Sequence, residues 1–202
     1  MPPVGVILAG GASGRFGGAK GLQRVGGVRI IDRVVAALSA VAPDLLLVAN
    51  AGDAGTWLPE APLVADMIPG GGGLSGVHAA LSHSGRAVVV VAWDMPFVSP
   101  ALLRELVTRG SGRLAEASVP QSASPVGMEP FCAWYAAASL TPLDRALRAG
   151  EFGAARFIRG LTRVEWLPET DASAFGDPAR LYFSVNTRDD LARAEAMASI
   201  PG

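Results

Sequence analysis

The chain of 202 residues is predicted to form an α/β fold, with a mostly parallel central sheet and a mixed edge from the second half. Two observations carry this prediction. Short apolar runs alternate with helical patterns through the first half, as they do in strand–helix–strand units. The run 86–93 contains four consecutive valines, which is typical of a strand buried on both faces. Such units are right-handed, so helices are expected to cover both faces of the sheet.

The first half supplies the parallel part of the predicted sheet. Continuous apolar runs predict strands at 4–9, 45–49, 63–65 and 86–93. Apolar residues at helical spacing predict helices over 30–41 and 74–81, the second of which is entered from a run of glycines. A third helix is predicted to begin at Pro100, with Ser99 as its N-cap.

The second half has a less regular pattern. Extended segments are predicted at 115–119, at 128–135 (antiparallel or on a sheet edge), at 164–167 and at 182–185. Helices are predicted over 143–149 and 154–159, and a last helix begins at Thr187 with Asp190 in the capping-box position. The stretch 121–127 is a polar loop. Since neither a repeat nor a linker interrupts the pattern, residues 1–202 are expected to form one domain.

Composition excludes several classes of protein. The 17 Lys and Arg residues nearly balance 18 Asp and Glu, and this argues against a nucleic-acid groove or an anionic-membrane surface. Half of the residues are hydrophobic, which argues against disorder. No apolar stretch reaches the ~18 residues of a membrane span, and no signal peptide is recognisable. The single cysteine, Cys132, excludes an intramolecular disulfide and indicates a reducing, cytoplasmic location.

Polar residues follow the four predicted strands of the first half. The first strand leads into a glycine-rich loop with Arg15 and Lys20, and the next three are followed by Asn50, Asp66 and Asp94. Ligands of open α/β sheets bind at the carboxyl ends of the strands, so these groups are expected to converge. Glycines let backbone N–H groups face phosphate oxygens, and the two cations neutralise a polyphosphate. The sequence therefore predicts a phosphate-binding site at this edge.

The glycine loop matches neither standard nucleotide fingerprint. No three of its glycines fit G-x-G-x-x-G, and Gly21 follows Lys20 where the Walker A motif has Ser or Thr. Sixteen of the 17 basic residues are Arg, and Lys20 is the exception. The alternative interpretation is a surface loop with incidental cations.

The carboxylates and the second glycine run also have two interpretations. Asp94 is either a Mg²⁺ ligand or a turn residue, and Ser99 already serves as the next helix cap, which favours the metal. Asn50 and Asp66 could each be a turn residue. The run 70–76 either approaches a ligand closely or is a flexible connection. His78, His83 and Cys132 are interpreted as packing or surface residues.

Together, these motifs resemble the MobA-type molybdenum cofactor guanylyltransferases, within the wider NTP-transferase family. Leu8-Ala9-Gly10-Gly11-x-x-x-Arg15-Phe16-Gly17 with Lys20 is similar to the L-A-G-G-x-x-x-R-M-G signature, which many sugar-nucleotide transferases share. Further motifs in the family's order make the resemblance more specific: Val48-Ala49-Asn50, Val64-Ala65-Asp66, Gly73-Leu74-Ser75-Gly76, Trp93-Asp94-Met95-Pro96 and Val185-Asn186-Thr187-x-x-Asp190-Leu191.

The resemblance implies a Rossmann-like three-layer sandwich that transfers GMP from GTP to molybdopterin and releases pyrophosphate. It implies Mg²⁺ as cofactor, GTP and molybdopterin as substrates, and transient contact with cofactor-biosynthesis or acceptor proteins. By this match, Asp94 would hold Mg²⁺, Asn186 would lie on the acceptor side, and the catalytic residues would be Arg15, Lys20 and Asp94. The residues expected to bind GTP are Leu8, Ala9, Gly10, Gly11, Lys20, Asn50, Asp66 and Asp94.

The chain departs from the family pattern at several positions. Ala19 stands where an acidic residue is usual, Phe16 replaces Met, and Gly73 replaces the proline of G-P-L-A-G. The stretch 121–129 carries no cation, so the resemblance supports the GTP side of the site more than the acceptor side.

Three other functions remain open from the sequence. One is transfer of a cytidylyl group to molybdopterin, or of a nucleotide to a sugar phosphate, although Gly10-Gly11 and the run 73–76 favour guanine. Another is a non-catalytic, GTP-binding regulatory protein. A dinucleotide-dependent dehydrogenase is more distant, because its glycine fingerprint is missing.

Overall fold

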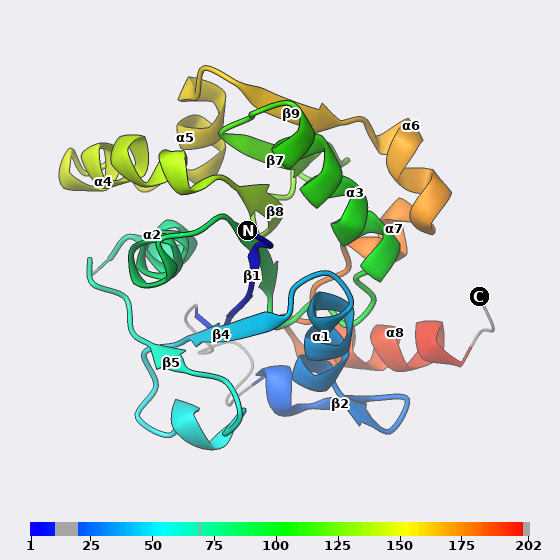
Figure 1. The fold of residues 1–202 in the computed structure, drawn as a ribbon. Helices are drawn as coiled ribbons and strands as arrows, with labels where there is room; N and C mark the ends of the chain where they lie inside the picture. The colour runs from blue at the N-terminus through cyan, green and yellow to red at the C-terminus, as the bar shows by residue number, and fades with distance from the viewer. Residues whose placement is uncertain (11–19, 69, 200–202) are drawn as a thin grey trace.

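The computed structural model describes residues 1–10, 20–68 and 70–199 and contains a seven-stranded sheet (Figure 1). The strand order is β5-β4-β1-β6-β8-β7-β9. The strands are β1 (Val4–Leu8), β4 (Asp44–Val48), β5 (Leu63–Val64), β6 (Val88–Ala92), β7 (Ala117–Pro120), β8 (Cys132–Tyr135) and β9 (Val164–Leu167). A separate hairpin joins β2 (Arg24–Val25) to β3 (Val28–Arg29).

The first-half strands form a parallel block, as predicted. β1 lies between β4 and β6, with Leu8 opposite both Val48 and Ala92. All five residues of β1 are buried, because helices cover both faces of the sheet. The β-branched, non-alternating pattern of these strands therefore reflects burial on two sides.

The second half builds the mixed edge that the sequence indicates. β8 runs antiparallel to β6, with Cys132 opposite Val91, and also antiparallel to β7. β9 then adds to β7 in parallel. The extended segment predicted at 128–135 begins as a strand only at Cys132, and Met128 makes an isolated bridge to Gln121.

Helices form the two outer layers. The helices are α1 (Ile30–Ser39), α2 (Gly72–Ser84), α3 (Pro100–Gly112), α4 (Leu140–Arg148), α5 (Ala154–Gly160), α6 (Glu169–Ala172), α7 (Pro178–Leu181) and α8 (Arg188–Ala198). Residues of α1 and α3, such as Leu38 and Leu102, pack into one core. Residues of α2, α4 and α5, such as Leu74 and Ile158, pack into the other. Figure 1 shows α2 and α4 to one side of the strands and α1 and α3 to the other.

The strand predicted at 182–185 is wrong. This segment is irregular and connects α7 to α8, and Val185 makes a backbone hydrogen bond to the Asp94 carbonyl (2.9 Å). Its aromatic and β-branched residues resemble a strand because Val185 is buried and Phe183 packs in a small core with β2 and α8. Strand propensity largely measures such burial, and here burial is satisfied without a neighbouring strand.

The helix starts are largely as predicted. Pro100 is the first residue of α3, although the Ser99 side chain makes no cap hydrogen bond within the described residues. Thr187 and Asp190 form the complete capping box of α8. The β2–β3 hairpin and the short helices α6 and α7 were not predicted, because each has too few residues for a recognisable period. No helix in the described ranges combines the length and apolarity that a membrane crossing needs.

Candidate nucleotide site at the carboxyl edge of the sheet

The polar residues after β1, β4, β5 and β6 lie along one edge of the sheet. Trp93 donates its backbone N–H to the Leu8 carbonyl (3.1 Å), so Gly10 and Asp94 come just beyond the paired ends of β1 and β6. Parallel strands place their carboxyl ends together, and this brings segments far apart in the sequence to one crevice. The predicted convergence is therefore confirmed for the described residues.

Asn50 and Asp66 form a reciprocal hydrogen-bonded pair between the ends of β4 and β5. The Asn50 side-chain amide donates to Asp66 Oδ2 (3.0 Å), and the Asp66 backbone N–H donates to Asn50 Oδ1 (2.8 Å). Burial raises the pKa of the Asp66 carboxyl, and the bond from Asn50 partly opposes this. Two mutual bonds hold both side chains in one orientation, ready to contact a ligand.

A small pocket adjoins this pair. Its lining residues come from the ends of β1 and β4 and from the start of α2: Leu8, Gly10, Val48, Ala49, Asn50, Asp66, Gly72, Gly73 and Gly76. A Cβ atom on Gly76 would come within 2.9 Å of Leu8 Cδ2 and 3.5 Å of Asp66 Oδ1. Glycine at position 76 thus lets α2 approach the strand ends without displacing the Leu8 side chain.

Lys20, Asp94 and Asn186 meet at the end of β6. Lys20 Nζ forms an ion pair with Asp94 Oδ2 and donates a hydrogen bond to Asn186 Oδ1 (2.8 Å). The side chains of Lys20 and Asp94 are only 12% and 9% exposed. Ser184 Oγ lies 3.4 Å from Asp94 Oδ1 and is oriented to donate to it. The free-energy cost of burying the Asp94 carboxylate is therefore offset by a cation and hydrogen-bond donors.

Gly21 explains how Lys20 reaches this position. A Cβ atom on Gly21 would lie 2.3 Å from the Trp93 ring, so only glycine lets the turn at 20–22 pack on that indole. Trp93 in turn stacks on Trp57, with ring centroids 4.8 Å apart. Gly21, which stands where the Walker A motif has Ser or Thr, thus has a packing role beside Asp94.

The two polar clusters occupy separate parts of the edge. Asp66 follows β5 and Asp94 follows β6, and β4 and β1 lie between these strands. Three strand spacings amount to about 14 Å, too far for the two carboxylates to bind one metal ion. Within the described ranges, no three His, Cys, Asp or Glu side chains are grouped to hold a metal. The donor set at Asp94 therefore suits a cation that takes most of its ligands from phosphate and water, as Mg²⁺ does.

The structure brings together most of the predicted site residues. Leu8, Gly10, Asn50 and Asp66 line the pocket, while Ala9 is buried and donates its backbone N–H within the sheet. Gly11 and Arg15, predicted to bind GTP and to act in catalysis, lie outside the described residues. Ser184 was missed, because a lone serine has no sequence signal of a contact 90 residues away.

The remaining candidates behave as packing residues. His78 is buried, and its Nε2 lies 3.1 Å from Asp144 Oδ1 between α2 and α4. Cys132 is fully buried in β8, and burial raises the pKa of its thiol, which disfavours a reactive thiolate. Both observations confirm the interpretation from sequence.

The fold and this edge define an α/β protein of the nucleotidyltransferase class. Residues 5–166 match the model of the MobA-like NTP transferase domain, and the chain belongs to this family. It is 36% identical over 199 residues to a probable molybdenum cofactor guanylyltransferase of Pelotomaculum thermopropionicum, covering 98% of this chain and 94% of that protein. A probable molybdenum cofactor guanylyltransferase of Chloroflexus aggregans is also 36% identical, over 95% of this chain and 93% of that protein.

A solved structure agrees with these sequence relatives. The molybdopterin-guanine dinucleotide biosynthesis protein A of Archaeoglobus fulgidus superposes with a TM-score of 0.81 at 30% identity. The superposition covers 97% of this chain and 98% of that one. The similarity therefore includes the C-terminal segment with Asn186, which lies beyond the part matched by the family model.

Proposed function

We propose that this chain is a molybdenum cofactor guanylyltransferase, which transfers GMP from GTP to molybdopterin and forms the molybdopterin guanine dinucleotide. The names of its relatives and its family membership support this activity. The structural observation that carries it is the meeting of Lys20, Asp94 and Asn186, which come from three distant segments, at the same edge as the Asn50–Asp66 pair.

The two clusters suggest how GTP lies along the edge. The nucleoside is placed against Leu8, Gly10, Asn50 and Asp66, where the pocket of about 20 Å³ must widen to admit a base, and the triphosphate extends toward Lys20 and Asp94. A separation of about three strand spacings suits an extended nucleotide. We further propose that Ala9 and Gly11 contact GTP, as the matching motif implies, that Arg15 stabilises charge on the triphosphate, and that Asn186 faces the acceptor.

The proposed reaction is a displacement at the α-phosphorus of GTP. A terminal phosphate oxygen of molybdopterin forms the new P–O bond, and the bond to the β-phosphate oxygen breaks, so that pyrophosphate leaves with that electron pair. The acceptor phosphate is already an anion at neutral pH, and no protein base is required. Lys20 lies where it can stabilise negative charge on the triphosphate, and the rate depends on positioning and charge.

Asp94 is the proposed ligand for Mg²⁺. The ion, when bound, would neutralise phosphate charge and polarise the phosphoryl oxygens. Asp94 offers one carboxylate, and the hydrogen-bond donors Lys20 and Ser184 hold that carboxylate at the end of β6.

The proposal is tested with purified protein, Mg²⁺ and either GTP or CTP, each with and without molybdopterin. We expect pyrophosphate and the guanine dinucleotide only with GTP and acceptor together. A preference for CTP would assign a cytidylyltransferase, and turnover with a sugar phosphate in place of molybdopterin would assign that acceptor. Binding of GTP without Mg²⁺-dependent turnover would instead support the regulatory alternative.

We also propose a domain organisation, a location and partners for this protein. Residues 1–202 act as a single nucleotidyltransferase domain, the protein functions in the cytoplasm, and it makes transient contact with proteins that make or receive the cofactor. Size-exclusion chromatography of mixtures with a molybdoenzyme acceptor, with and without GTP, tests the last of these.

A further inference from the structure

A second cavity, of about 210 Å³, opens at the same edge of the sheet as the nucleotide site. It lies between the loop that joins β7 to β8 and the segment of α6 and α7. Its polar lining consists of Ser122, Ser124, Glu129, Glu169 and Tyr182. Among the described residues that line it there is no Lys or Arg, although Arg is abundant in the chain.

Glu129 is a fixed hydrogen-bond acceptor in this cavity. Ser122 Oγ donates to Glu129 Oε1 (2.6 Å), and the Glu129 backbone N–H donates to the Pro120 carbonyl (3.0 Å). The residue is half-buried, and burial raises the pKa of its carboxyl. A carboxylate in this setting gains from a ligand with N–H groups, because such donors replace the lost water.

Tyr182 lines the same cavity, and its hydroxyl group lies just beneath the surface. Its oxygen is buried and has no hydrogen-bond partner within the described part of the chain. Buried polar groups nearly always have partners, so an orphan hydroxyl beside a cavity indicates a missing ligand or water.

Two chain segments connect this cavity to Asp94. Tyr182 lies two residues before Ser184, which is oriented to donate to the Asp94 carboxylate. On the other side, Phe131, close in sequence to Glu129, accepts a backbone hydrogen bond from Ala92 at the end of β6 (2.8 Å). The cavity therefore adjoins the phosphate end of the site, on the side opposite the Asn50–Asp66 pocket in the strand order.

The size and chemistry of the cavity select one class of ligand. Its volume equals that of about seven waters, enough for a fused pair of six-membered rings. The two lining carboxylates, Glu129 and Glu169, disfavour a phosphate, and a carboxylate favours adjacent N–H donors on one ring edge. Pterin and guanine share the 2-amino-4-oxo pyrimidine edge that presents this pattern. Because the guanine of GTP is placed at the Asn50–Asp66 pair, this cavity is assigned to the pterin of the acceptor.

We propose that Glu129 and Tyr182 recognise the pterin ring of the acceptor, with Glu129 accepting the 2-amino and N3 hydrogens and Tyr182 bonding to another polar atom of the ring. This inference rests on the proposed function for the identity of the acceptor. This proposal also explains how the stretch 121–129, which carries no cation, serves the acceptor side. The stretch binds the neutral ring, and Lys20 interacts with the phosphate of the acceptor.

A binding titration tests the recognition without any turnover. The intact protein is titrated with free pterin and with lumazine, which has a 2-oxo group in place of the 2-amino group, and ring fluorescence is followed. We expect the wild type to prefer pterin at least tenfold. Glu129→Gln presents an amide donor in place of one carboxylate oxygen, so it should lose this preference or reverse it toward lumazine.

Two further variants separate recognition from misfolding. Tyr182→Phe removes one oxygen atom and should weaken pterin binding severalfold while the thermal midpoint stays at or above that of the wild type. Glu60→Gln, at an exposed residue before β5, should bind both rings as the wild type does. Equal affinity of the wild type for the two rings, or an unchanged ratio in Glu129→Gln, would overturn the proposal.

Steady-state assays then link the cavity to the reaction. In Glu129→Gln, the KM for molybdopterin should rise at least tenfold while the KM for GTP stays unchanged. An unchanged acceptor KM would refute the role of Glu129 in the reaction. Failure of the wild type to transfer GMP would refute the proposed function, whereas the pterin titration would still decide whether the cavity recognises this ring.

Discussion

At Lys20 a single ammonium group meets two acceptors that the fold brings from 74 and 166 residues away, Asp94 and Asn186. An ammonium is compact and can direct its donors to both, whereas a guanidinium is planar and longer. The packing of Gly21 on Trp93 leaves the backbone of this turn little freedom to move back. The use of lysine here, in a chain that otherwise uses arginine, therefore has a geometric reason.

This reasoning predicts the effect of Lys20→Arg. The variant keeps the charge but cannot keep both contacts, so kcat/KM for GTP should fall about tenfold or more, and Lys20→Ala should lose about 100-fold. Initial rates of pyrophosphate release provide the measurement, with circular dichroism as the folding control. Full activity of Lys20→Arg would show that only the charge matters.

Asp94→Asn tests the carboxylate at the end of β6. The change removes the charge that would hold Mg²⁺, so kcat/KM should fall at least ~100-fold and the dependence on Mg²⁺ concentration should shift to higher values. Asp189→Asn, at an exposed residue of α8, is the matched control and should retain wild-type rates. Similar rates in the two variants would remove Asp94 from the metal site.

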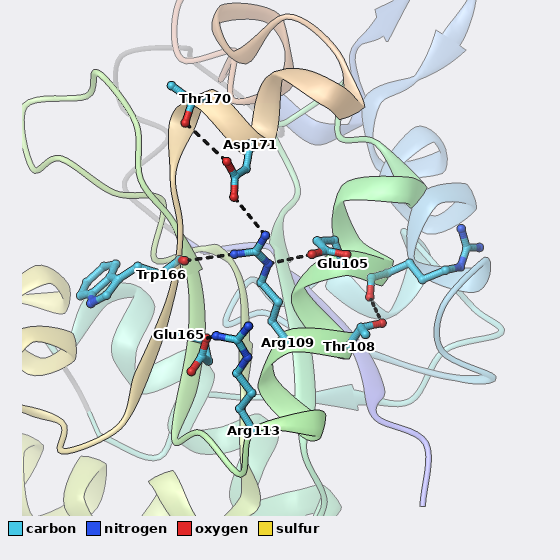
Figure 2. A network of polar contacts seen from close by, with 9 residues as sticks. Glu105, Thr108, Arg109, Arg113, Glu165, Trp166, Thr170 and Asp171 are labelled. Carbon is cyan, nitrogen blue, oxygen red and sulfur yellow. Dashed lines mark hydrogen bonds and ion pairs between the residues drawn. The ribbon is translucent and has the colours of Figure 1, made fainter.

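Among the elements, α3 is tied to β9 and α6 by a group of arginines (Figure 2). Arg109 donates to Glu105 (2.7 Å) on its own helix and to Asp171 (3.1 Å) on α6, and Figure 2 shows its guanidinium between them. Arg113 reaches Glu165 of β9 (2.9 Å). The contact of Arg113 and the bond from Arg109 Nη1 to the Trp166 carbonyl (3.5 Å) hold β9, the edge strand of the described sheet, and the bond to Asp171 holds α6.

Arg109→Met is expected to destabilise the fold by about 1 kcal/mol, because it breaks several partly buried contacts at once. The Arg113 side chain is 65% exposed and has one ion-pair partner among the described residues, so Arg113→Met should leave the unfolding midpoint in urea nearly unchanged. Equal midpoints for the two variants would show that the Arg109 contacts add no stability. Neither change touches the nucleotide edge, so both variants should retain activity.

The N-cap of α8 stabilises the helix and lies next to Asn186 of the candidate site. Thr187 accepts a bond from the Asp190 backbone N–H (3.1 Å) and follows Asn186, which contacts Lys20. Thr187→Ala should cost about 1 kcal/mol in chemical denaturation, whereas Thr187→Ser, which keeps the cap, should cost much less. A stability of Thr187→Ala equal to that of Thr187→Ser would show that the capping hydroxyl is dispensable.

For the whole molecule, the site spans strand ends from β5 to β6 and adds the segments before α1 and α8, so nucleotide binding should stabilise the entire fold. GTP at 100 times its Kd should add about 2.7 kcal/mol, which corresponds to a rise in Tm of roughly 5–10 °C. Differential scanning fluorimetry with GTP, CTP and ATP measures this rise. Equal shifts with all three nucleotides would contradict a guanine-selective pocket.

The parallel half of the fold and the residues after its strands follow from the sequence. The valine run of β6 and the spacing of α1 are local patterns, and local periodicity reports burial. Because parallel strands end at a common edge, the strand pattern also predicts that Asn50, Asp66 and Asp94 lie along one edge, although not that they form two separate clusters. Likewise, the capping box at Thr187 could be read directly, since its donors and acceptors lie within one helical turn.

Only the tertiary structure decided which distant groups meet. The segment 182–185 has the composition of a strand, yet it crosses the end of β6, because burial in a local cluster is enough to select such residues. The contact of Lys20 with Asn186 and the cavity of Glu129 and Tyr182 depend on where whole elements pack. The type of a residue and its spacing in the sequence indicate whether its side chain is buried. They do not indicate which distant residue it contacts, because the topology of the fold determines that partner.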